Sequence, residues 1–230
     1  MTVVDIAVES VTFEFTVTPE HGKVSAILDR TETAQSLLVL GHGSGSNMHV
    51  PLISGLSAAL VNADVATFRY EYPYSNREDF VPYSGIEMDD PEVLLATVRS
   101  AIATAVAMAP DLPLFAGGHS VSGQMTSIAD ADSPLPDVCG IVLLGFPLKG
   151  DLGRAAHFKS ATKPLLFIQG AADALADVDQ IAQVVNDIGA AATLHIVESA
   201  DHGFTVPDRE DGEVIEELAR TVADWTIDHI

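Results

Sequence analysis

A serine, an aspartate and a histidine in this chain each follow a strongly apolar run, and together they are the residue types of a nucleophilic catalyst. Ser120 lies in the segment GHSVSG at residues 118–123, straight after the run LFA at 114–116. Asp173 follows the apolar run at 165–168, and His202 follows the run at 193–197. A histidine that a carboxylate holds in one tautomer can remove the proton of a serine hydroxyl at neutral pH. The three residues therefore predict Ser120 as nucleophile, His202 as base and Asp173 as the orienting acid.

The turn around Ser120 indicates a strand that breaks at glycine into a tight turn and then a helix. Such a turn lifts one side chain out of the sheet at a helix N-terminus, whose free N–H groups can stabilise an oxyanion. The usual pattern is G-x-S-x-G, but here Ser122 stands at the second glycine position and Gly123 comes one residue later. We expect the extra hydroxymethyl group to reduce the packing margin between helix and strand without abolishing function. The alternative is that Ser120 only caps the helix.

These residues need a sheet whose strands end at a common edge. Strands are predicted at residues 3–8, 11–17, 24–28, 37–40, 65–70, 114–116, 138–144, 165–168 and 193–197. Helices are predicted at residues 51–62, 91–108, 123–129, 178–188 and 212–227. Strands and helices alternate from residue 37 onward, and several later strands are continuously apolar, which indicates burial on both faces. We therefore expect an α/β fold with a mostly parallel central sheet, antiparallel N-terminal strands, helices on both faces and ligands at the strands' carboxyl ends.

Length and composition favour one domain over residues 1–230, because a chain of 230 residues that is 47% hydrophobic can bury a large core. The segment at 146–164 lies between two strands and is too short for a cap domain, so we expect an open, shallow site. No particular oligomeric state is predicted.

The charge of the chain argues against two classes of partner. With 33 acidic and 11 basic residues, its net charge of −22 repels nucleic acid and anionic membrane surfaces. The most apolar helical run, at residues 94–108, is interrupted by Arg99 and is short of a membrane span. We expect a cytoplasmic protein with no nucleic-acid or membrane partner.

Cofactor and metal sites are not predicted. The glycine-rich turn at residues 41–46 lacks the lysine of a phosphate-binding loop. His49, His157 and His195 lack carboxylate or cysteine partners at ligand spacing, so no metal site is expected. His42, within that turn, is expected to hold the loop backbone by hydrogen bonding.

From about residue 37 to its end, the chain resembles the α/β-hydrolase superfamily and, within it, the small dienelactone-hydrolase-like group. The motifs that carry the resemblance are GHGSGSNM at 41–48, FRYEYPY at 68–74, GGHS at 117–120, LGFPL at 144–148, the segment 168–173 and DHGF at 201–204. The chain order Ser120, Asp173, His202 is also that of the superfamily. The resemblance implies a Ser-His-Asp triad of these residues, with the backbone N–H groups of Ser44 and Val121 as the oxyanion hole. Dienelactone hydrolases use a cysteine nucleophile, so Ser120 argues against carrying over their substrate.

We therefore expect a cofactor-free serine hydrolase that cleaves small-molecule carboxylic esters through an acyl-enzyme intermediate. Several aromatic residues fall on loops after strands and are expected either to line the acyl pocket or to pack the loops. The candidates for the pocket are Tyr72, Tyr74, Phe146 and Phe204. Asp177 and Asp201 are alternative carboxylates, although Asp201 should point away from its neighbour His202. A thioesterase or peptidase would use the same triad, and the altered position Ser122 leaves a non-catalytic scaffold of the same fold as the alternative outside enzymes.

Overall fold

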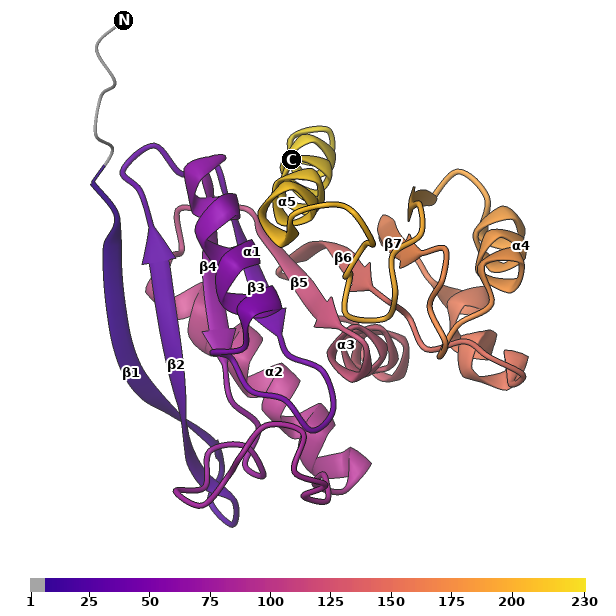
Figure 1. Cartoon of the computed structure of the whole chain (residues 1–230). Coiled ribbons are helices and arrows are strands. Elements are labelled where there is room, and N and C mark those ends of the chain that lie inside the picture. The colour runs from indigo at the N-terminus through magenta and orange to yellow at the C-terminus, as the bar shows by residue number, and fades with distance from the viewer. Residues whose placement is uncertain (1–6) are drawn as a thin grey trace, which may run out of the picture.

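The computed structural model describes residues 7–230, so most of the strand predicted at 3–8 lies outside the described residues. One sheet of eight strands has the order β1-β2-β4-β3-β5-β6-β7-β8 (Figure 1). The strands are β1 (Glu9–Thr18), β2 (Gly22–Arg30), β3 (Ser36–Gly41), β4 (Val65–Tyr70), β5 (Leu114–His119), β6 (Val138–Leu144), β7 (Leu165–Gly170) and β8 (Ala192–Val197). β2 is antiparallel to both β1 and β4, whereas the pairs from β4 through β8 are parallel. The expected mostly parallel sheet with an antiparallel start is confirmed.

Helices cover both faces of the sheet, as predicted (Figure 1). They are α1 (Pro51–Asn62), α2 (Pro91–Met108), α3 (Val121–Asp132), α4 (Val178–Ile188) and α5 (Asp211–Ile227). One core cluster joins the sheet to α1 and α5, and a second joins its other face to α2, α3 and α4. Every residue of β3, β4 and β7 is buried. Burial on both faces explains why the hydrophobic runs of β3 and β7 are continuous rather than alternating.

The helix α2 corrects one expectation. With residues 91–93 included it has 18 residues and is, by length and composition alone, apolar enough to cross a membrane. Here it packs on the sheet face beside β1 and α3, with Leu94, Val98 and Ile102 buried. Its Arg99 donates to the carbonyl of Ser133, the residue that follows the C-terminus of α3. Length and composition alone do not distinguish a helix packed in a protein core from one that crosses a membrane.

The segment between β6 and β7 contains a 3₁₀ helix, η1 (Leu152–Ser160), which the sequence analysis did not predict. The carboxylate of Asp151 caps it by accepting from the Gly153 N–H. Within residues 7–230 no cap domain covers the carboxyl ends of the strands. The loops after β3, β4, β5, β7 and β8 therefore meet at one uncapped edge of the sheet.

Candidate active site

The turn from β5 into α3 holds Ser120 in a strained backbone conformation. Ser120 has φ 53° and ψ −116°, a region that non-glycine residues rarely adopt and that costs about 1–3 kcal/mol. Its N–H donates to the Leu144 carbonyl of β6 at 2.8 Å, which anchors the turn to the sheet. A side chain at Gly118 would lie 2.2 Å from the Gly41 carbonyl, so β3 and β5 can approach here only through glycine. The turn therefore projects the Ser120 hydroxyl beyond the end of β5.

The structure brings Ser120, His202 and Asp173 together from the ends of β5, β8 and β7. The imidazole Nε2 of His202 lies 3.0 Å from the Ser120 Oγ, and its Nδ1 lies 2.8 Å from the Asp173 Oδ2. Because the carboxylate oxygen only accepts, Nδ1 carries the proton and Nε2 is free to accept from the serine hydroxyl. This arrangement can remove the Ser120 proton as the oxygen attacks an electrophile.

Asp173 is held by donors on both oxygens. The Gln169 amide donates to Oδ2 at 2.6 Å, and the Leu175 N–H donates to Oδ1 at 2.7 Å. Burial, the largest effect, raises the pKa of Asp173, but the hydrogen bonds from His202, Leu175 and Gln169 outweigh it and leave the pKa below its ordinary value. Asp173 is therefore ionised at neutral pH and keeps the His202 ring in one orientation.

The two alternative carboxylates have other roles. Asp177 is the N-cap of α4 and accepts from the N–H groups of Asp179 and Gln180. Asp201 turns back on its own loop and accepts from the N–H groups of Gly203 and Thr205. The His202 ring nitrogens have Ser120 and Asp173 as their hydrogen-bond partners, not Asp177 or Asp201.

Ser122 occupies its motif position differently from what the sequence suggested. Its side chain is fully buried, its hydroxyl donates to the His42 carbonyl, and it receives the Tyr72 hydroxyl at 2.9 Å. The close approach of helix to sheet occurs at Gly123, where an added Cβ would lie 2.9 Å from the Gly118 carbonyl. Ser122 thus links α3 to the loop after β3. The close approach of helix to strand that the motif's second glycine normally allows is provided by Gly123.

His119, the residue before Ser120, contacts the loop of His202. Its Nε2–H donates to the His202 carbonyl at 2.8 Å, and the two rings lie 4.8 Å apart between centroids. Burial, aided by the nearby His202, lowers the pKa of His119 to about 4. His119 is therefore neutral at neutral pH and holds the backbone of His202 as a hydrogen-bond donor.

A cavity of about 780 Å³ opens beside Ser120, and both residues predicted for the oxyanion hole, Ser44 and Val121, line it. Val121 is the first residue of α3, so its N–H has no acceptor within the helix. The walls combine apolar side chains with charged ones of both signs: Met88, Leu94, Met125, Leu175, Glu87, Asp90, Lys149 and Arg154. Among the described residues no cluster of three or more histidine, cysteine or carboxylate side chains could hold a metal ion.

Of the two alternatives for the four aromatic side chains, packing of the loops fits the structure, since none of the four lines this cavity. The side chains of Tyr72, Tyr74 and Phe146 are at most 1% exposed and belong to the hydrophobic core. Phe204 is also buried and borders a different cavity, near His119. Loop position alone did not decide between the two alternatives, because it does not show that these loops carry their aromatic rings inward.

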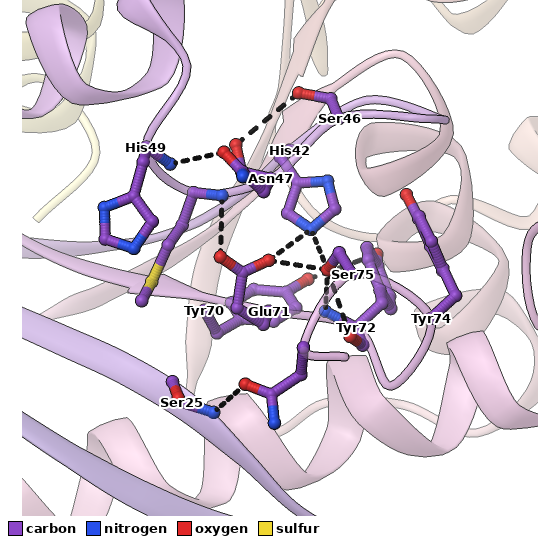
Figure 2. Close-up of polar contacts among 12 residues, drawn as sticks. Ser25, His42, Ser46, Asn47, His49, Tyr70, Glu71, Tyr72, Tyr74 and Ser75 are labelled. Carbon is purple, nitrogen blue, oxygen red and sulfur yellow. Dashed lines mark hydrogen bonds and ion pairs between the residues drawn. The ribbon is translucent and has the colours of Figure 1, made fainter. Parts of the chain in front are cut away.

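Sequence reasoning missed three polar residues of the site: Gln169, Glu71 and Ser75. Gln169 is fully buried at the end of β7, where it supports Asp173. Glu71 and Ser75, in the loop after β4, are buried beside His42 (Figure 2). A polar side chain that directly ends a buried apolar strand was the available signal, because burial requires that it find a partner.

Comparison with known proteins gives one family. Residues 34–230 match the family described as "Alpha/beta hydrolase domain". No curated protein sequence matches the chain.

Solved structures share the fold over nearly the whole chain. Dienelactone hydrolase from Anabaena variabilis has a TM-score of 0.74 at 19% identity, covering 97% of this chain and 99% of its own. A serine hydrolase without a lid from Xanthomonas campestris has a TM-score of 0.72 at 19% identity, with 94% and 95% covered. A cold-adapted esterase from an Arctic intertidal metagenomic library has a TM-score of 0.69 at 16% identity, with 96% and 95% covered. At these identities the likeness establishes the fold.

Proposed function

Because this chain belongs to the α/β-hydrolase family and is a hydrolase, we propose that it is a serine hydrolase that cleaves carboxylic esters through an acyl-enzyme intermediate. Ser120 is the nucleophile, His202 the general base and then acid, and Asp173 the orienting carboxylate. The observation that carries the proposal is the continuous hydrogen-bonded line from the Ser120 Oγ through the His202 imidazole to Asp173, at 3.0 Å and 2.8 Å.

The reaction follows from these contacts. The Ser120 oxygen attacks the ester carbonyl carbon while its proton passes to the His202 Nε2. The imidazolium, stabilised by ionised Asp173, gives that proton to the departing alcohol as the acyl-enzyme forms. Water then repeats the sequence on the acyl-enzyme and releases the carboxylic acid. Both tetrahedral intermediates carry a negative oxygen that the Ser44 and Val121 N–H groups would bind.

Two observations favour esters over the alternatives. The cavity is uncapped, so it accepts small or extended acyl groups without enclosing a long chain. Esterases recur among the structures with this fold. Thioesters and amides need the same triad, so a panel with one acyl group and oxygen, sulfur or nitrogen leaving groups separates the three activities. We expect the oxygen ester to give the largest kcat/KM.

The triad is tested by turnover of p-nitrophenyl acetate. Ser120→Ala should lower kcat by about 10⁶-fold, because no other group replaces the nucleophile. Ser127→Ala is a matched control, since the Ser127 Oγ contacts the His157 Nε2 at 2.9 Å. That histidine has no carboxylate hydrogen-bond partner among residues 7–230, so this Ser–His pair lacks the third member and its loss should leave kcat within about 3-fold. Equal turnover by wild type and Ser120→Ala would contradict the proposal, and a folded wild type with no turnover would favour a non-catalytic scaffold.

A further inference from the structure

A buried cluster of polar and charged side chains lies behind the loop after β3, which carries the proposed oxyanion donor Ser44. The cluster has no role in the triad. His42, Glu71 and Ser75 are exposed by 0%, 4% and 6% (Figure 2). The His42 Nε2 lies 3.3 Å from the Glu71 Oε2 and 3.1 Å from the Ser75 Oγ. The second oxygen of Glu71 accepts from the Met48 N–H at 3.2 Å. A carboxylate this far from water is stable only when paired and hydrogen-bonded.

The hydrogen-bond partners of His42 fit a positive charge on its ring. Its Nδ1 lies 2.9 Å from the Gly43 carbonyl, which only accepts, so Nδ1 carries a proton. The Ser75 hydroxyl carries one proton and lies within hydrogen-bond distance of Glu71, the Tyr72 carbonyl and the His42 Nε2. When that proton goes to Glu71 or to Tyr72, the His42 Nε2 faces two acceptors and carries a proton of its own. An imidazolium His42 paired with ionised Glu71 therefore satisfies every one of these contacts.

The other titratable neighbours of His42 are uncharged at neutral pH, so none of them is an alternative ion-pair partner. The rings of Tyr72 and Tyr74 meet it edge-on, with centroids 5.2 Å and 5.9 Å away. Burial raises the pKa of both tyrosines, so both remain neutral donors. Beyond the loop backbone lies His119, which is neutral at neutral pH. Glu71 therefore supplies the negative partner.

The cluster fixes the orientation of the peptide that carries the oxyanion donor. The Gly43 carbonyl accepts from the His42 Nδ1, from the Tyr74 hydroxyl at 3.2 Å and, within its own loop, from the Ser46 N–H at 3.3 Å. In a trans peptide the next N–H points opposite to the carbonyl, and the structure contains no cis peptide among residues 7–230. The Ser44 N–H consequently points away from the buried cluster, toward the side of the loop where Ser44 and Ser120 line the same cavity.

We propose that the His42–Glu71 ion pair is a positioning device that aims the Ser44 N–H at the oxyanion and places a positive charge behind it. This inference rests on the proposed Ser120 hydrolase and deepens it. His42 touches no reacting atom, so its effect passes through the Gly43–Ser44 peptide. The pair should matter more in the tetrahedral transition state, where the oxyanion exists, than in the bound ester.

Kinetics test the positioning role. Glu71→Gln keeps a side-chain acceptor for the Met48 N–H but removes the charge, and we expect kcat for p-nitrophenyl acetate to fall on the order of 10- to 100-fold with KM within about 3-fold. Affinity for a boronic acid that forms a tetrahedral adduct on Ser120 should fall in parallel with kcat/KM. Glu217→Gln is the matched control, because Glu217 pairs with His195 at 2.8 Å on β8 and α5, away from the cavity. It should leave kcat unchanged.

A milder variant and a spectroscopic readout keep the test decisive if Glu71→Gln unfolds. Tyr74→Phe removes only the hydroxyl donor to the Gly43 carbonyl and should lower kcat severalfold at constant KM. Two-bond ¹⁵N–¹H spectra of wild type at pH 7.5, assigned with His42→Asn, should show both His42 ring nitrogens protonated.

The outcomes distinguish this inference from the function on which it rests. Inactive wild type with a doubly protonated His42 would overturn the hydrolase proposal and support the charge assignment. Active wild type with a neutral His42, or with Glu71→Gln as active as Glu217→Gln, would overturn the positioning role alone.

Discussion

His119, the residue next to the nucleophile, contacts two loops of the site, and its protonation affects the stability of the fold. It donates to the His202 carbonyl and lies against Gly43, where an added Cβ would be 2.6 Å from the His119 Nδ1. It therefore contacts the loop of the base and the loop of the oxyanion donor while preceding Ser120 in the chain. The sequence offered only its place in the GHS motif, because its contacts depend on loops that are 76 and 83 residues away.

The depressed pKa of His119 predicts a pH dependence of stability. Its pKa falls from 6.5 to about 4 through burial and the proximity of His202. Between these values the unfolded chain binds more protons than the folded chain, so the free energy of unfolding decreases as pH drops from 6.5 toward 4. The contribution is up to about 3 kcal/mol, complete above pH 6.5 and lost below pH 4.

Urea unfolding at pH 7 and pH 4.5 measures this contribution. His119→Gln keeps a donor of similar reach but does not titrate, so its loss of stability between the two pH values should be smaller than that of wild type by on the order of 2 kcal/mol. Parallel losses in the two proteins would show that His119 is not held neutral by the fold.

At the scale of elements, the packing of α3 against β3 and β5 depends on which residue is glycine. The sequence predicted α1, α2 and α4 to the residue, since each has a distinct periodicity and boundary. It did not predict α3 as well, placing its start at 123 instead of Val121, because the turn residues carry little periodic signal. It also treated Ser122 as a departure that weakens packing, whereas its hydroxyl joins α3 to the His42 carbonyl.

Ser122→Ala separates these two accounts of Ser122. If serine only crowded the crossing, the smaller alanine would stabilise the fold. Because a buried hydroxyl bonded to His42 and Tyr72 is lost, we expect unfolding free energy to fall by about 1–2 kcal/mol instead. Ser54→Ala, which removes a hydroxyl that donates within and just before α1, is the control and should change stability by less than about 0.5 kcal/mol. Higher stability of Ser122→Ala than wild type would refute the linking role.

At the scale of the whole molecule, the site is assembled from five strand ends at one edge of the sheet. The sequence predicted this edge, and it predicted which strands bring Ser120, Asp173 and His202 there, because parallel strands have a common polarity. It did not predict which loop side chains turn inward. Tyr72 and Tyr74 are buried because the loop after β4 packs over the sheet and around His42, a long-range arrangement that local patterns do not contain (Figure 2).

The central claim is that Ser120 is a nucleophile activated by His202, and a fluorophosphonate probe with intact-mass and peptide analysis tests it most directly. We predict a single adduct on wild type, located at Ser120, with labelling that is abolished in Ser120→Ala and strongly slowed in His202→Gln. Labelling of Ser127→Ala should match that of wild type. A folded wild-type protein that takes up no probe, or whose adduct lies on another serine, would contradict the account.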